Sequence, residues 1–194
     1  MKVGVFGGTF NPIHTGHAII AGYVAQHCQL DKVMLMVSPL NPFKANRPEA
    51  VSDIHRLRMA ELVSRNLPKV YTSAFEFGLP KPSYTIDTLN ALQAKFPDDE
   101  LYLIIGADNW SAWDKWRDHD EILRKYHLIV YPRLGHEVTI PQELAHRVTL
   151  ADAPIIEISS SHIRAELQAG RDMCYWVPAE VYQYIRNNHL YEQE

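Results

Sequence analysis

Residues 7–17 read GGTFNPIHTGH, and they come directly after the apolar run VGVF at residues 3–6. The apolar run predicts a buried strand, the two glycines a tight turn, and the apolar residues that follow a helix. Amides of a glycine turn approach a phosphate closely, and a helix N-terminus adds partial positive charge. His14 and His17 are three residues apart, so their rings share one face of a helical turn. The stretch therefore predicts a phosphate-binding strand–turn–helix unit.

Three other kinds of site share parts of this pattern. A Walker-type phosphate loop needs G-K-[ST], which this stretch lacks. A dinucleotide-binding turn needs G-x-G-x-x-G, and the spacing of Gly7, Gly8 and Gly16 does not match it. A zinc site on His14 and His17 needs further ligands, and no Cys, Asp or Glu stands beside them. Phosphate binding is therefore favoured, with a metal-binding or structural role as the alternative.

Composition and charge narrow the class of protein. The 194 residues are 46% hydrophobic and 22% charged, which is typical of a soluble globular protein. A formal net charge of −4 argues against non-specific nucleic-acid binding, which needs a positive surface. Cys28 and Cys174 form no C-x-x-C pair, no apolar run approaches membrane-spanning length, and we expect no signal peptide. We expect a cytoplasmic protein without nucleic-acid or membrane partners; a homo-oligomer is left open.

Strand-like and helix-like segments alternate along the whole chain. This alternation predicts an α/β, Rossmann-like fold, in which a doubly wound, mainly parallel sheet carries helices on both faces. We expect strands at 3–6, 33–37, 70–74, 101–105, 128–131 and near 155–156. We expect helices at about 17–27, 52–66, 85–96 and 178–189. A single domain is expected over residues 1–194, with a small helical part from about residue 165.

The loop from Ser38 to Val51 follows the carboxyl end of the second expected strand. It holds three prolines together with Lys44 and Arg47, so it is irregular and basic. Open α/β sheets bind their ligands at the carboxyl ends of strands. We expect Lys44 to bind phosphate from a loop that closes over the site. The alternative is a solvated connection with incidental charges.

A second anion site is expected where residues 158–164 read ISSSHIR. Ser160 and Ser161 stand at the start of an expected helix, where hydroxyl groups and amides are available to an anion. Arg164 lies one helical turn beyond Ser160, and its guanidinium suits bidentate contact with phosphate. On its own, such a serine run is as often only a helix N-cap.

These two motifs resemble the nucleotidylyltransferase superfamily, whose members join a nucleoside triphosphate to a phosphate or carboxylate acceptor. The first is similar to its G-G-[ST]-F-[DN]-P-x-H-x-G-H signature, and the second to its I-S-S-[ST]-x-[IL]-R motif. Residues 83–89, SYTIDTL, and 105–110, IGADNW, with Trp113 and Trp116 after them, are similar to the bacterial nicotinate mononucleotide adenylyltransferases. The resemblance extends from residue 3 to the expected final helix.

The resemblance implies three groups of site residues. At the reacting phosphates it implies the catalytic residues His14, His17 and Arg164. For ATP binding it implies Gly7, Gly8, Thr9, Phe10, Gly106, Asp108, Arg133, Ser160 and Ser161. For binding the acceptor it implies Lys44, Tyr84, Thr85 and Trp116.

Three of these residues also have a physical interpretation. Trp116 offers a flat face to a pyridinium ring, and a cation–π contact contributes roughly 0.5–2 kcal/mol; alternatively Trp110, Trp113 and Trp116 form a core stripe. Asp108 is placed to accept hydrogen bonds from ribose hydroxyls, or else to cap a helix. Thr85 opens a helix whose amides suit a nicotinate carboxylate.

Two positions depart from the family pattern. Asn11 stands where many members have Asp, which weakens any role for that carboxylate in this chain. Residues 41–44 read NPFK in place of the more usual PPHK, so Lys44 is kept while its aromatic neighbour changes.

The resemblance implies that ATP and nicotinate mononucleotide give nicotinate adenine dinucleotide and pyrophosphate. The acceptor phosphate has its second pKa near ~6, so it is already largely a dianion and needs no general base. Mg²⁺ is expected as the cofactor, held by ATP and water rather than by protein ligands. Alternative acceptors are nicotinamide mononucleotide and phosphopantetheine. A non-catalytic adenylate-binding module is a further alternative.

Overall fold

The computed structural model describes residues 1–39 and 51–192, and their strands form a six-stranded sheet in the order β3-β2-β1-β4-β5-β6. The strands are β1 (Lys2–Gly8), β2 (Lys32–Val37), β3 (Val70–Ser73), β4 (Glu100–Gly106), β5 (His127–Tyr131) and β6 (Val148–Leu150). All five pairings are parallel. The chain winds outward from β1 to β3 and then returns to β4 on the other side of β1. This doubly wound order confirms the predicted Rossmann-like class.

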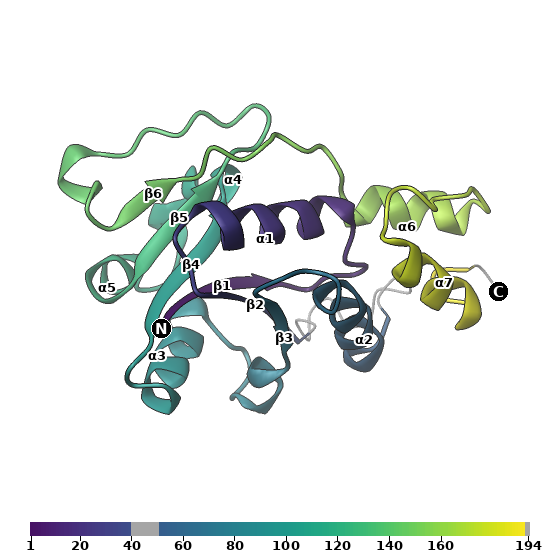
Figure 1. Cartoon of the computed structure of the whole chain (residues 1–194), viewed down its shortest axis with the longest axis horizontal. Helices are drawn as coiled ribbons and strands as arrows, with labels where there is room; N and C mark the ends of the chain where they lie inside the picture. The colour runs from purple at the N-terminus through teal and green to yellow at the C-terminus, as the bar shows by residue number, and fades with distance from the viewer. Residues whose placement is uncertain (40–50, 193–194) are drawn as a thin grey trace.

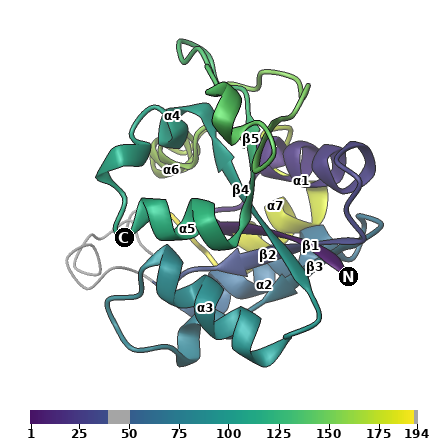
Figure 2. The ribbon, with the colours of Figure 1, turned by 90° about the vertical axis from the view of Figure 1, so that its left-hand side faces the viewer.

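Helices cover both faces of the sheet. One face carries α1 (Thr15–His27) and α2 (Asp53–Ser64), and the other carries α3 (Thr85–Lys95) and α5 (His119–Lys125). In Figure 2, α3 and α5 lie on the opposite side of β1 and β4 from α1. The shorter elements are η1 (Phe75–Gly78), α4 (Ala107–Trp110), η2 (Trp113–Lys115) and η3 (Gln142–Leu144). Within the described residues, every helix is too short or too polar to cross a membrane.

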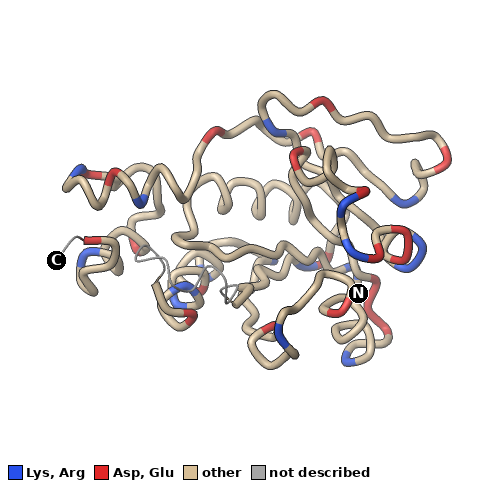
Figure 3. The backbone as a smooth tube through the Cα atoms, turned by 180° about the vertical axis from the view of Figure 1, so that it is seen from behind, with Lys and Arg blue, Asp and Glu red and all other residues tan. Residues whose placement is uncertain are grey.

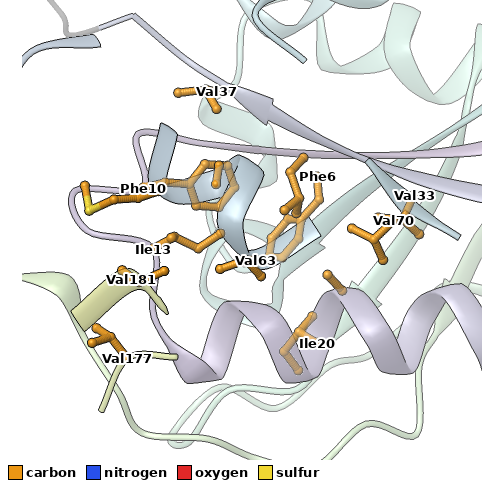
Figure 4. Close-up of a cluster of buried hydrophobic side chains, with 14 of the residues drawn as sticks. Phe6, Phe10, Ile13, Ile20, Val33, Val37, Val63, Val70, Val177 and Val181 are labelled. Atoms are coloured by element: carbon orange, nitrogen blue, oxygen red, sulfur yellow. The ribbon is translucent and has the colours of Figure 1, made fainter. Parts of the chain in front are cut away.

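Two hydrophobic cores follow from the alternation of side chains along the strands. On β1, Phe6 points into the core beneath α1 and α2, where it lies near Ile20 and Val63 (Figure 4). Val3 and Val5 on the same strand point into the second core, beneath α3 and α5. Strands buried on both faces need apolar residues at every position. This need explains why the central strands read as continuous apolar runs in the sequence.

One element prediction was wrong. The sixth strand is Val148–Leu150, paired with β5, and not residues 155–156. Pro154 lacks an amide hydrogen and stands directly before Ile155, which is exposed, so this segment has left the sheet. The true strand is a three-residue edge strand with two exposed side chains, so its apolar signal is weak. The helix expected at Ser160 and Ser161 does begin at Ser160, with Ser159 as its N-cap, and it opens the C-terminal helical part a few residues before residue 165.

The C-terminal part lies beyond the carboxyl end of β1. It contains α6 (Ser160–Gln168) and α7 (Ala179–Asn187), at the end of the molecule opposite the amino terminus (Figure 1). Val177 and Val181 pack into the same core as Phe10 and Ile13 (Figure 4). The buried hydroxyl of Tyr191 donates a hydrogen bond of 2.7 Å to Oδ1 of Asn11. The last part of the chain therefore supports the turn that follows β1.

Candidate active site

Most of the predicted site residues gather at the carboxyl ends of β1 and β4, where the strand order reverses. Two hollows lie there, which we call the inner and outer cavities. The inner cavity has a volume of about 290 Å³, and its walls include Gly7, Gly8, Thr9, Thr85, Gly106 and Trp116. The outer cavity has about 620 Å³, with walls that include Asp108, Arg133, His136, Ile158, His162 and Trp176. A switch point of this kind is where open α/β sheets bind ligands.

The two histidines lie between these cavities. They line a narrow gap together with Tyr131, which also lines the inner cavity, and Arg133, which also lines the outer one. The rings of His14 and His17 are stacked, with centroids 3.7 Å apart. This confirms that both rings lie on one face. The histidine gap therefore shares wall residues with both cavities.

Reciprocal capping of α1 fixes the orientation of both rings. His14 is the N-cap, and its Nδ1 accepts a hydrogen bond of 3.3 Å from the amide of His17. The amide of His14 donates in turn to Nδ1 of His17, also at 3.3 Å. An Nδ1 that accepts a hydrogen bond carries no proton, so each neutral ring carries its proton on Nε2. Both histidines therefore present an N–H donor on the side of the ring away from the backbone.

The surroundings hold both rings in the neutral form. Burial, and then the nearby guanidinium of Arg133, lower the pKa of His14 to about 4. The pKa of His17 lies well below its ordinary value, because of burial and then the charges of His14 and Arg133. No Lys, Arg, Asp or Glu occurs from Val3 to Leu30, so β1 and α1 carry no such side chain there (Figure 3). At neutral pH this segment offers a phosphate uncharged donors.

The shifted pKa of His14 predicts a pH dependence of stability. Between about pH 6.5 and pH 4 the unfolded chain binds a proton at this histidine and the folded chain does not, so acid favours unfolding. We expect His14 to remove about 3 kcal/mol from the free energy of unfolding between pH 7 and pH 4. His14→Asn, which keeps an N-cap residue, is expected to lose that much less on acidification.

Chemical denaturation at several pH values measures this difference. His27→Asn, at the exposed C-terminal end of the same helix, serves as the control for loss of a histidine. Equal acid sensitivity in wild type and His14→Asn would contradict the prediction.

The end of β4 supplies a second group of side chains. A Cβ at Gly106 would lie 2.3 Å from Oδ1 of Asp108 and 3.2 Å from the Tyr131 ring, so a side chain there would displace the Asp108 carboxylate. Nε of Arg133 lies 3.7 Å from Oδ1 of Asp108, and the guanidinium lies 5.4 Å from the centroid of the Tyr131 ring. The N-cap of α4 is Gly106, so the capping alternative for Asp108 is wrong. Asp108 and Arg133 instead line the outer cavity side by side.

The serine motif packs against the histidine turn from the other end of the chain. The hydroxyl of Ser160 donates to the carbonyl of Pro12 at 2.9 Å. Arg164 donates to the carbonyl of Asn11 at 2.8 Å and to the hydroxyl of Ser161 at 3.4 Å. The two motifs are thus brought together, and these contacts hold the turn in place. Contact of Ser160, Ser161 and Arg164 with a phosphate stays a prediction.

Of the four residues predicted to bind the acceptor, three lie in the described parts of the chain, and two of these line the inner cavity. Thr85, the first residue of α3, and Trp116 both line the cavity, whereas the Tyr84 ring is exposed and lies against Arg117. Trp113 is buried in the core, with its ring 5.2 Å from that of Trp116, so the core interpretation holds for Trp113. Lys44 and the closing loop lie outside the described residues.

Phe10 takes a different place from the one predicted. Its ring is buried in the core, where it packs edge-on against Phe6 and His17 at centroid distances of 6.0 and 5.1 Å. Its backbone has a positive φ of 48°, an uncommon conformation for a residue other than glycine. The side chain therefore shapes the turn, and an ATP contact of this residue is left to its backbone.

Sequence reasoning missed Arg56, a side chain that holds the site together. Arg56 is 0% exposed on α2, and it donates to the carbonyl of Thr9 and, at 2.7 Å, to the carbonyl of Ser38. It also pairs with Asp53 on the same helix. A charged residue one helical turn before the apolar Met59 and Ala60 is a signal that was available in the sequence. Arg56 joins the turns that follow β1 and β2.

Sequence reasoning also missed Glu76, another charged side chain that is buried in the structure. It follows the carboxyl end of β3 and stands between two phenylalanines, where an acidic residue is unexpected. Its side chain is buried, lines the inner cavity and accepts a hydrogen bond from Thr88. Sequence gives no direct signal that it reaches the same cavity as Trp116.

Comparison with known proteins agrees with this geometry. A family model described as cytidylyltransferase-like matches residues 5–166. A Bacteroides fragilis protein named "Probable nicotinate-nucleotide adenylyltransferase" is 45% identical over 184 residues, which cover 95% of this chain and 90% of that protein. A protein of the same name from Bacteroides thetaiotaomicron is 41% identical over 186 residues, covering 96% and 91% of the two chains.

A solved structure shares the fold. Plasmodium falciparum nicotinic acid mononucleotide adenylyltransferase, complexed with NaAD, superposes with a TM-score of 0.80 at 17% identity, covering 98% of this chain and 97% of that one. At this identity the likeness shows the fold alone. The family follows instead from the high identity and nearly complete coverage of the relatives. The chain belongs to the nicotinate-nucleotide adenylyltransferases, within the cytidylyltransferase-like proteins.

Proposed function

We propose that this protein transfers the adenylyl group of ATP to nicotinate mononucleotide, which gives nicotinate adenine dinucleotide and pyrophosphate. The observation that carries the proposal is the pair of neutral histidine donors between two cavities. One cavity is lined by an indole ring and the start of a helix, and the other by an arginine and an aspartate. Two different nucleotides can occupy these cavities with their phosphates meeting at the histidines. The cytoplasm is proposed as the compartment, because ATP is a substrate.

The inner cavity suits the pyridine nucleotide. Trp116 offers its face to the positively charged ring, and the first turn of α3 at Thr85 offers amides to the ring carboxylate. An amide in place of that carboxylate carries no charge, so it gains less from the helix N-terminus. This difference supports nicotinate over nicotinamide mononucleotide as the preferred acceptor.

The outer cavity suits the adenosine part of ATP. Asp108 is placed to accept hydrogen bonds from ribose hydroxyls, and the guanidinium of Arg133 lies between this cavity and the histidines. The α-phosphate then comes next to His14 and His17. Gly7, Gly8 and Thr9 line the inner cavity, and their backbone amides are proposed to bind the triphosphate of ATP where the two nucleotides meet.

The chemical step needs orientation and charge stabilisation more than proton transfer. The acceptor phosphate is largely a dianion at neutral pH, so its oxygen attacks the α-phosphorus without a general base. The enzyme must hold two anions in line and stabilise the charge that develops on the leaving pyrophosphate. Nε2–H donors of two neutral imidazoles do this without losing a proton to the substrate. Arg164, held against the same turn, is proposed to contribute a positive charge at this centre.

Magnesium is proposed to enter with ATP. Mg²⁺ prefers oxygen ligands and keeps several waters, so phosphate oxygens can hold it. Across residues 1–39 and 51–192, no group of three or more His, Cys, Asp or Glu is arranged to hold a metal. The side chains at the histidine gap are donors and not carboxylates, which fits a metal carried by the triphosphate. Mg²⁺ would neutralise the β- and γ-phosphates.

A pyrophosphate-release assay tests the proposal. Purified protein is mixed with ATP, Mg²⁺ and either nicotinate or nicotinamide mononucleotide, and release is followed with time. We expect release with the acid to exceed release with the amide by at least about tenfold, the order expected for one charged hydrogen bond in a closed site. Comparable rates would refute the role of Thr85, and no release with either acceptor would refute the proposed reaction.

A further inference from the structure

Glu76 is a buried carboxylate with one unused oxygen beside the inner cavity. It lies in η1, just past the end of β3, and is 7% exposed. Its Oε1 accepts a hydrogen bond of 2.7 Å from the hydroxyl of Thr88. Its Oε2 is buried and has no hydrogen-bond partner within the described parts of the chain. A buried carboxylate that keeps an oxygen unpaired is costly unless a donor or cation is supplied to it.

Glu76 is also the source of charge in this cavity. Of the described residues that line it, Glu76 is the one with an acidic or basic side chain, Tyr131 aside. The remaining walls are apolar side chains, glycines, hydroxyl groups, Trp116 and the uncharged amide of Asn109. Low polarity strengthens the interaction of the carboxylate with any charge that enters. An occupant with positive charge is therefore favoured.

We infer that Glu76 recognises the positive charge of the pyridinium ring and so selects an acceptor with a cationic base. The inference rests on the proposed function, in which nicotinate mononucleotide occupies this cavity. Its ring nitrogen is bonded to ribose and carries a permanent positive charge. Trp116 contacts a ring face, and Glu76 supplies the opposite charge. Glu76 is thus a specificity-determining residue and takes no part in bond making.

The hydrogen bond that holds Glu76 against α3 also orients the ring. Its partner Thr88 lies three residues after Thr85, on the same face of the helix and about 4.5 Å further along the axis. The ring has a negative carboxylate and a positive nitrogen at a comparable separation. The helix N-terminus at Thr85 attracts the carboxylate, whereas Glu76 repels it and attracts the nitrogen. One orientation of the ring satisfies both groups.

The test distinguishes recognition of the positive charge on the ring from recognition of the shape of the ring. The probes are nicotinate mononucleotide and a benzoate C-ribotide, in which a ring carbon replaces the charged nitrogen while the carboxylate, ribose and phosphate stay the same. Calorimetry without ATP measures the Kd of each probe for wild type and for Glu76→Gln. We expect Glu76→Gln to weaken binding of the cationic probe roughly 10- to 100-fold and leave the neutral probe nearly unchanged.

Two further variants guard against a purely structural effect. Glu76→Asp keeps the charge, and Thr88→Val removes the tether to α3 while keeping the carboxylate. Both are expected to keep the preference for the cationic ring, even where affinity for the two probes falls together. A Glu76→Gln protein that loses both probes equally, or that keeps the wild-type preference, overturns the inference. The inference is also overturned if the Glu76→Asp protein has a normal melting curve but binds the uncharged probe more tightly than the cationic one.

The same experiment distinguishes failure of the proposed function. Wild-type protein that binds nicotinate mononucleotide but forms no dinucleotide with ATP and Mg²⁺ refutes the reaction, while the ratio of the two Kd values still decides the role of Glu76. Wild-type protein that binds neither probe refutes both.

Discussion

Replacing His17 by alanine is expected to lower kcat for dinucleotide formation by about 10²–10³-fold, with KM for either substrate changed much less. His17 presents its Nε2–H donor between the two cavities, where negative charge builds up as pyrophosphate leaves. A donor that is fixed in place before the reaction stabilises this charge without reorganisation. Alanine removes it and leaves room for water, which must be ordered at each turnover.

Folding is expected to survive this change. The substitution removes one capping contact, in which Nδ1 of His17 accepts from the amide of His14, and such contacts contribute about 1 kcal/mol. His27→Ala on the same helix is the matched control, because its ring is exposed and stacks only on Tyr23 among the described rings. Steady-state kinetics of the two variants, with thermal melts, make the comparison. A loss of only a few-fold in His17→Ala would remove His17 from the chemical step.

Arg56→Met is expected to reduce the free energy of unfolding by about 3 kcal/mol, which lowers Tm by about 6–12 °C for a chain of this size. The guanidinium is fully buried, and its removal leaves the carbonyls of Thr9 and Ser38 without this donor. Each buried polar group that loses its partner costs about 1–3 kcal/mol. Asp53 is partly exposed, so water compensates for the lost ion pair.

Activity is expected to fall as well, because the same arginine positions Thr9. We expect kcat/KM to drop by at least about tenfold, since small displacements of positioning groups have effects of this order or larger. Arg58→Met is the matched control: Arg58 lies on the same helix and pairs with Glu61 at 2.8 Å, but these side chains are 44% and 38% exposed, whereas Arg56 is fully buried. Such surface pairs contribute 0–1 kcal/mol. Equal Tm values for Arg56→Met and Arg58→Met would contradict the interpretation.

Part of this site could be predicted from sequence because it is built by interactions between residues that are close together in the chain. Residues 7–17 combine a buried strand, a glycine turn and a capped helix, and local geometry alone places His14 over His17. Thr85 begins α3 for an equally local reason. Interactions between residues close in sequence leave a periodic or compositional signal. The fold class is visible for the same reason, because strands buried on both faces must be continuously apolar.

The edge strand shows where local signals fail. β6 has three residues and two exposed side chains, so its pairing with β5 depends on a neighbour and not on its own pattern. Residues 155 and 156 look more strand-like, yet the chain has left the sheet by then. The apolar pattern of a short segment indicates only its tendency to form a strand. Contacts with neighbouring strands decide whether that segment joins the sheet.

Sequence by itself determined the doubly wound sheet, the histidine turn and the family to which the chain belongs. Only the tertiary structure decided which distant side chains support that turn: Arg56 from α2, Ser160 and Arg164 from α6, and Tyr191 from the C-terminus. It also placed the buried Glu76 beside Trp116. Spacing in sequence carries no information about contacts between elements that meet only when the sheet and its helices pack. The neutrality of the histidines has the same origin, because it depends on burial and on the charge of Arg133.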